Sequence, residues 1–249
     1  MKKIFNFYML ICSISFFSGQ IKIEIKPETS IMSSKTFVEL KIVNETNYKY
    51  IVPLNVTDLK PYFQAENCIN YEDVSFRQTN DLFLRLVFVN TVNNSYEDRI
   101  FNNPNPSALI HSNEKKKKEF EKKKDSAIKS YNRIIDQWIK KYNIKKSKNW
   151  AEINRAISES LIYLEPQQTI TYKIYVDPSK LYSSRMYETG NNFYSYYLEN
   201  NIDYNFLLKY CVDSNIYQYL TERQKNKIKG YKLFSGILES NILKWKEKR

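Results

Sequence analysis

The sequence has few of the residues on which common catalytic motifs depend: one histidine, three cysteines and four glycines in 249 residues. A Ser-His-Asp triad could be built only around His111, and the glycines form no Gly-x-Ser-x-Gly elbow and no phosphate-binding loop. A structural zinc site usually takes four His or Cys ligands. Outside the N-terminal segment that holds Cys12, only three such residues remain. These absences predict a protein without catalytic residues, cofactors or a metal site.

Residues 1–20 have the layout of a secretory signal peptide. Lys2 and Lys3 come first, an apolar stretch runs over residues 4–17, and small or polar residues follow. The stretch is short for a membrane span, which needs about 20 residues. We therefore expect an exported protein, periplasmic or extracellular, with no transmembrane segment in the mature chain. A buried N-terminal strand or helix is the alternative.

The positive charge is weak evidence for a partner. Removing residues 1–20 would lower the net charge from +12 to +10. The chain is rich in Lys, Asn, Ile, Tyr and Phe, whose codons are AT-rich, so a low-GC genome would produce this bias without selection. Cys68 and Cys211 are more informative, because an even pair in an oxidising compartment indicates a disulfide. Two buried free thiols are the alternative.

Alternating apolar and polar residues predict strands with one buried face over much of the chain. The expected strands are residues 21–26, 36–43, 48–54, 81–90, 168–176, 204–212, 231–238 and 241–245. Residues 81–90 are apolar on both faces, which predicts a central strand. The strands come in clusters without a helix between each pair. We therefore expect a mainly β fold, an antiparallel two-sheet sandwich.

Three segments resemble the immunoglobulin-like modules of exported bacterial proteins: FVELKIVNETNYKYIVPL, YLEPQQTITYKIYVDP and DYNFLLKYCV. In such modules a strand ending in Asn turns into an apolar strand, a Leu-x-Pro segment leads into an alternating strand, and an aromatic-rich strand follows. The resemblance implies an immunoglobulin-like sandwich and assigns no functional residue. The Tyr-x-Cys of antibody-type domains is absent, because Tyr210 directly precedes Cys211.

The spacing of apolar residues changes between about residues 113 and 160, from the two-residue period of a strand to the steps of three and four of a helix. Apolar residues from Phe120 to Tyr142 recur at steps of three and four, with one gap of seven, which predicts an amphipathic helix. Capping patterns predict two further helices, starting at Asn149 with Glu152 and at Thr221 with Gln224. We expect one β-sandwich domain over residues 21–249 with a helical insertion at about 113–160, α+β overall.

The insertion begins with EKKKKEFEKKK, residues 114–124, which carry seven lysines and three glutamates, a net charge of +4. Glutamate four residues before lysine favours a solvated helix. The alternative is a basic patch that contacts anionic lipid, lipopolysaccharide or an acidic protein in a salt-dependent way. Its residues are Lys115, Lys116, Lys117, Lys118, Lys122, Lys123 and Lys124.

A tyrosine-rich segment precedes the strand expected at 204–212. Exposed tyrosines offer apolar ring faces and hydroxyl groups at low entropic cost, which suits recognition of protein or sugar. The candidate binding residues are Arg185, Tyr187, Tyr194, Tyr196 and Tyr197. A short packed helix is the alternative for this segment.

These observations predict an exported, non-enzymatic binding protein whose partner is an unknown protein or an anionic envelope component. Nucleic acid is not expected, because of the export signal and because the lysine run has a single aromatic residue, Phe120, for base stacking. A hydrolase of envelope or extracellular polymers is one alternative, since paired carboxylates need no sequence motif. A proteinase inhibitor is another, because small exported immunoglobulin-like modules can block proteases through loops.

Overall fold

The structure is a computed structural model that describes residues 21–28, 35–62, 68, 82–102, 114–181, 193–199 and 201–245. The expected signal peptide lies outside these ranges, as do His111, Arg185 and Tyr187. Within them the protein is mainly β, as expected, with more strand than helix.

The described strands form four sheets. The first has the order β1-β2-β8, with bounds Ile21–Pro27, Thr36–Asn44 and Thr169–Val176. The second has the order β12-β10-β5-β4, with β13 also paired to β10; its bounds are Gly236–Glu239, Tyr204–Val212, Phe83–Asn90, Asn55–Pro61 and Leu243–Trp245. The third, β11-β3-β7, comprises Lys232–Leu233, Tyr50–Pro53 and Leu161–Leu164. The fourth pairs β6, Arg99–Asn102, with β9, Phe193–Tyr196.

The helices follow the changes of period in the sequence. Their bounds are Glu114–Tyr142 for α3, Lys148–Glu159 for α4, Ser214–Tyr219 for the 3₁₀ helix η3 and Glu222–Lys227 for α5. Thr221 and Gln224 form the predicted capping box of α5. The predicted cap of α4 is wrong, because Ser147 rather than Asn149 accepts the backbone N–H of Trp150.

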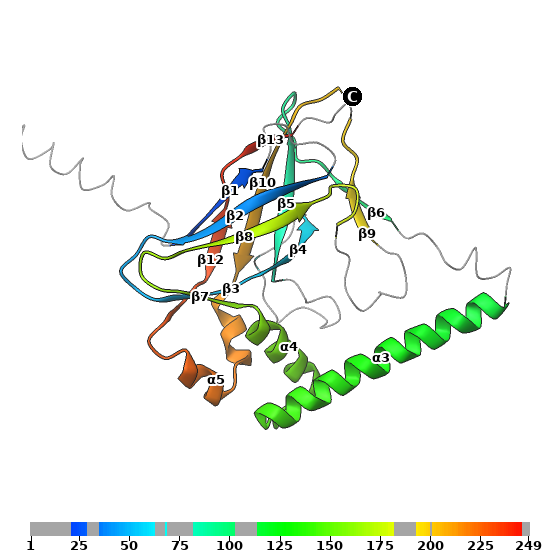
Figure 1. The fold of residues 1–249 in the computed structure, drawn as a ribbon, viewed down its shortest axis with the longest axis vertical. Helices are drawn as coiled ribbons and strands as arrows, with labels where there is room; N and C mark the ends of the chain where they lie inside the picture. The colour runs from blue at the N-terminus through cyan, green and yellow to red at the C-terminus, as the bar shows by residue number, and fades with distance from the viewer. Residues whose placement is uncertain are drawn as a thin grey trace, which may run out of the picture.

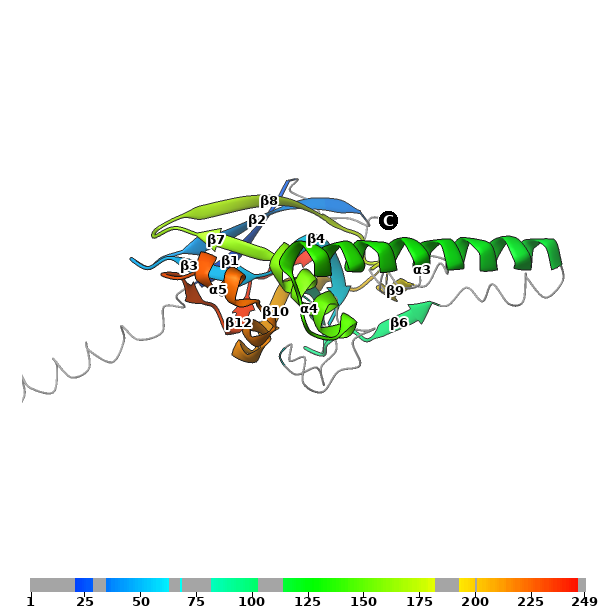
Figure 2. The ribbon, with the colours of Figure 1, turned by 90° about the horizontal axis from the view of Figure 1, so that it is seen from below.

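The two larger sheets lie in two layers: β2 and β8 cross β5 and β10 in Figure 1, and they lie above β10 in Figure 2. Successive side chains of a strand point to opposite faces, so Leu40 and Ile42 of β2 meet Phe206 and Leu208 of β10 in one buried cluster. This cluster also includes residues of β3, β7 and α4. The apolar faces read from the sequence therefore form the main core.

A long two-stranded ribbon connects the first and third sheets. β2 pairs antiparallel with β8, and β3, which follows β2 directly, pairs antiparallel with β7. Buried Asn44 occupies the bend between them, where its side-chain amide donates to the carbonyls of Tyr48 and Glu165. β3 thus pairs with β7, the strand that precedes β8, and does not fold back on β2 as a hairpin.

Several expectations about the strands need correction. β5 is central, as predicted, but β4, β6, β7 and β9 were not expected, and the C-terminal strands are three short ones. Most pairs are antiparallel, whereas β4–β5 and β11–β3 are parallel. Short strands such as β6, four residues long, show too few alternations to be recognised from sequence.

Candidate functional site

Helix α3 divides into two parts with different surroundings. We call residues 114–130 the arm and residues 131–142 the foot. Every described side chain of the arm is exposed except that of Phe120, which is half-buried. The foot lies against α4, while the arm projects beyond the β layers as a long green helix (Figures 1 and 2). At 1.5 Å per residue, the arm is about 25 Å long.

The arm carries the predicted basic patch. All seven lysines lie on α3, and the side chains of six of them are described as exposed: Lys115, Lys117, Lys118, Lys122, Lys123 and Lys124. Because successive residues turn by about 100°, lysines at 115–118 and 122–124 surround the helix. The predicted helix is confirmed, and its positive charge is spread around the whole circumference.

The foot is fixed by a small apolar cluster of its own. Ile135, Ile144 and Ala151 are buried together, and partly buried rings pack around them: Tyr131, Trp138, Tyr142 and Trp150. The rings of Trp138 and Tyr142 lie 4.4 Å apart between centroids. These side chains form the apolar face expected of the amphipathic helix, and it is concentrated in the foot.

A buried polar network joins the foot to the rest of the molecule. Trp138 donates its indole N–H to the side-chain oxygen of Asn154 on α4, at 2.8 Å. The Asn154 amide donates to the side chain of Gln224 and to the Tyr219 carbonyl, both at 2.6 Å, and Gln224 donates back. Because unsatisfied buried amides are costly, these bonds hold α3, α4 and α5 in one arrangement.

In the part of the expected tyrosine binding loop that the structure describes, residues 193–196 form strand β9. Tyr194 and Tyr196 lie on β9, opposite β6. Tyr196 is 6% exposed, donates its hydroxyl to the Leu86 carbonyl and accepts the Tyr62 N–H. Its interpretation as a binding residue was therefore wrong, because both ring and hydroxyl are used inside the protein.

The other described members of that prediction are more accessible. Tyr194 is half-buried, its ring lies 5.1 Å from that of Phe101, and the Arg99 guanidinium lies 4.9 Å from its ring centroid. Tyr197 is 70% exposed. Tyr194 and Tyr197 therefore keep ring surface available for contact, whereas Tyr196 does not.

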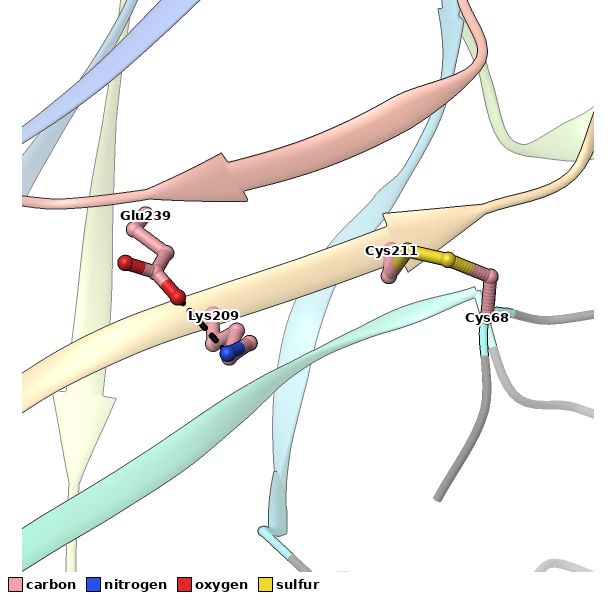
Figure 3. The surroundings of a disulfide bond; sticks show 4 residues. All are labelled: Cys68, Lys209, Cys211 and Glu239. Carbon is pink, nitrogen blue, oxygen red and sulfur yellow. Dashed lines mark ion pairs between the residues drawn. A yellow bond between two sulfur atoms is a disulfide. The ribbon is translucent and has the colours of Figure 1, made fainter. Parts of the chain in front are cut away.

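The predicted disulfide between Cys68 and Cys211 is present, with Cα atoms 4.6 Å apart (Figure 3). Cys211 lies on the face of β10 opposite the core, since Tyr210 and Val212 beside it are buried. Two residues earlier on the same face, Lys209 pairs with Glu239 of β12 at 2.7 Å. The hydrogen bond with Glu239 raises the pKa of Lys209. The disulfide therefore ties Cys68 to the outer face of the larger sheet.

The third sheet carries a second candidate surface, around Tyr163, Glu165 and Tyr231, which was not predicted from the sequence. Tyr163 and Glu165, from β7 and just beyond it, lie on the same side of the third sheet as Tyr231, which follows α5. Their only sequence signal is the alternation in LIYLE, residues 161–165, which is too short to predict a strand. The Tyr–Tyr contact depends on β11 reaching β3 from far along the chain.

The described residues offer little for catalysis. They contain no group of three or more His, Cys, Asp or Glu side chains placed to hold a metal ion. The two best-formed hollows among them are shallow: one follows the lysine-rich turns of the arm, and the other lies beside Tyr50, Lys232, Leu233, Phe234 and Ser235. Glu114 and Glu119 line the first, but both are on one exposed helix.

Comparisons with protein-family models, curated proteins and solved structures found no match. Across the ranges that the structure describes, none of the helices is both long enough and apolar enough to cross a bilayer.

Proposed function

We propose that this protein is an exported, non-enzymatic binding protein that attaches to an anionic component of the cell envelope through the arm. The observation that carries the proposal is the arm itself. It carries eight lysines, the seven of the basic patch and Lys129, on about 25 Å of helix that no described element covers. A rigid foot keeps this charge away from the body.

The distribution of charge favours contact without insertion. A helix that enters a bilayer interface needs a continuous apolar face, and residues 114–124 have lysines all around, with Phe120 as the one large apolar side chain. Attraction to headgroup phosphates or to an acidic polymer contributes about 1 kcal/mol per lysine near such a surface. Because it is electrostatic, the attachment weakens steeply as salt increases.

Export is the second part of the proposal. A disulfide that closes a separation of 143 residues is typical of an oxidising compartment, and residues 1–20 supply the export signal. The two-layer body, with its alternating strands, supports the immunoglobulin-like sandwich as its class. Such a body is a stable carrier for the arm.

The test compares two variants with equal charge. The arm variant replaces five lysines of the arm by glutamine, which keeps helix propensity: Lys117, Lys118, Lys122, Lys123 and Lys124. The body variant replaces five exposed lysines elsewhere: Lys26, Lys180, Lys227, Lys229 and Lys244. Both lower the net charge by five.

Binding is measured by co-sedimentation with vesicles of phosphatidylglycerol and phosphatidylcholine, and with dextran sulfate as a soluble competitor. We expect the arm variant to bind these vesicles about tenfold more weakly or worse, and the body variant to bind as wild type. High salt should release the wild type. Equal loss in both variants would reduce the effect to net charge and reject the arm as the site. Competition by dextran sulfate would separate a polyanion site from a lipid-specific one.

A further inference from the structure

The outer face of the third sheet carries a second, chemically different surface. Register places Leu233, Ile51 and Tyr163 side by side across β11, β3 and β7. Paired residues share a face of a sheet, and so do residues two apart along a strand. Tyr231, Lys49 and Glu165 therefore form the next row on the same face. We call these six residues the platform.

Contacts within the platform hold its side chains in place. The Lys49 ammonium lies 2.8 Å from Glu165 Oε2 and 3.1 Å from Oε1, and the Tyr231 hydroxyl donates to Oε1 at 2.9 Å. The hydrogen bonds from Lys49 and Tyr231 lower the pKa of Glu165, so the carboxylate is ionised at neutral pH.

The tyrosine rings complete the surface. Those of Tyr163 and Tyr231 meet edge to face, with centroids 5.5 Å apart. Ile51, which pairs with Tyr163 in the register, is fully buried, whereas Tyr163 is 45% exposed. Part of the Tyr163 ring therefore still faces the solvent, although Ile51 beside it is buried.

We propose that the platform binds a neutral carbohydrate chain. Tyrosine rings present apolar faces on which the C–H face of a sugar ring can stack, with hydroxyl groups beside them. A carboxylate offers about four acceptor positions, and Lys49 and Tyr231 account for three contacts, which leaves Oε2 able to accept from a sugar hydroxyl. Lys49 can donate in turn.

Charge and size favour this occupant over others. Lys49 and Glu165 cancel, so the platform has no net charge, in contrast to the arm, and selects no ionic ligand. A stable protein interface takes about 20–30 residues on each side, whereas the platform has six. A shallow hollow of about 560 Å³ lies beside Leu233 and gives a chain room to continue past the edge of the sheet.

The test uses the purified protein and calorimetric titration with hexasaccharides of glucose, N-acetylglucosamine, mannose and galactose. Tyr163→Ala removes one ring. Its matched control is Tyr175→Ala, because Tyr175 is 48% exposed, lies on β8 and also contacts another ring, that of Phe37. Glu165→Gln keeps the size of the carboxylate but removes its charge and one acceptor. Thermal unfolding of each variant checks that it is folded.

We expect at least one hexasaccharide to bind at high salt, Tyr163→Ala to weaken its binding about tenfold, Glu165→Gln to weaken it severalfold, and Tyr175→Ala to leave it unchanged. The arm variant should bind it as wild type, which separates this inference from the proposed function. Binding by none of the four sugars, or equal loss in Tyr175→Ala, would overturn the inference. The inference would also be overturned if the platform bound a protein but none of the four sugars, because the platform would then be a protein interface.

Discussion

The arm and the foot of α3 are one continuous helix in two environments. In the foot, Ile135 is buried in an apolar cluster and Trp138 donates a hydrogen bond to a buried polar network. In the arm, the described side chains are exposed apart from half-buried Phe120. Propagating a helix adds one hydrogen bond per residue once a first turn exists. The packed foot therefore supplies the nucleus, and lysine and glutamate, which are good helix formers, extend it. Packing of the foot therefore determines the position of the helix, and the helix propensity of the arm residues determines its length.

The largest expected effect concerns the packed body alone. Replacing both Cys68 and Cys211 by serine removes a link across 143 residues, which the chain-entropy model values at about 5 kcal/mol. Urea unfolding should show this loss. Hydrogen exchange should show the body losing protection, while the arm, whose backbone bonds are exposed in both proteins, changes little. An unchanged midpoint would mean that the disulfide does not stabilise the body.

The next effect compares one residue type on the two halves of the helix. Ile135 is 1% exposed and Ile128 is 43% exposed. Ile135→Ala leaves a cavity in the small cluster and should cost about 3 kcal/mol. Ile128→Ala should change stability by less than about 0.5 kcal/mol. Chemical denaturation measures both. Similar losses of unfolding free energy in the two variants would show that Ile128, and with it the arm, is packed against another part of the protein.

A smaller effect is expected from the polar network under the foot. Asn154→Ala leaves the Trp138 N–H, the Tyr219 carbonyl and the Gln224 amide without this partner. It should cost about 2 kcal/mol. Asn149→Ala, on the exposed side of the same helix, is the control and should be neutral. A neutral Asn154→Ala would mean that apolar contacts alone orient the foot.

Tyr196 and Tyr197 provide the same comparison away from the helix. Tyr196→Phe removes the hydroxyl bonded to Leu86 and Tyr62 and should cost about 1 kcal/mol. Tyr197→Phe, at an exposed position, should not change the thermal midpoint. Equal effects would contradict the different roles assigned to the two residues.

The last effect, which is seen only at high pH, lies where the arm meets the foot. Burial, reinforced by Glu152, raises the pKa of Tyr131 to about 12, above the value of about 10 in an unfolded chain. The folded state therefore holds the phenol proton more tightly. Its contribution to stability is complete below pH 10 and is lost as the pH rises from about 10 to about 12. Tyr131→Phe should be less sensitive to this change in unfolding experiments, and identical pH profiles would contradict the assignment.

Much of the fold could be predicted because alternation and helical period depend on neighbouring residues. β2, β8 and β10 alternate between inward and outward positions over eight or nine residues, and α3 carries its apolar stripe in the foot. β9 could not be predicted. Its four residues show hardly two alternations, and it becomes a strand because β6, about 90 positions earlier in the sequence, lies next to it.

The candidate sites divide in the same way. The sequence alone determined the lysine run, the cysteine pair, the alternating strands and the helix caps at Thr221, because each depends on residue identity at short spacing. Only the tertiary structure decided that Tyr196 turns inward, that the arm leaves the body, and that Lys49, Glu165 and Tyr231 meet. Those outcomes depend on contacts between distant segments. Which segments meet is set by the packing of the whole core, and no short stretch of sequence records that.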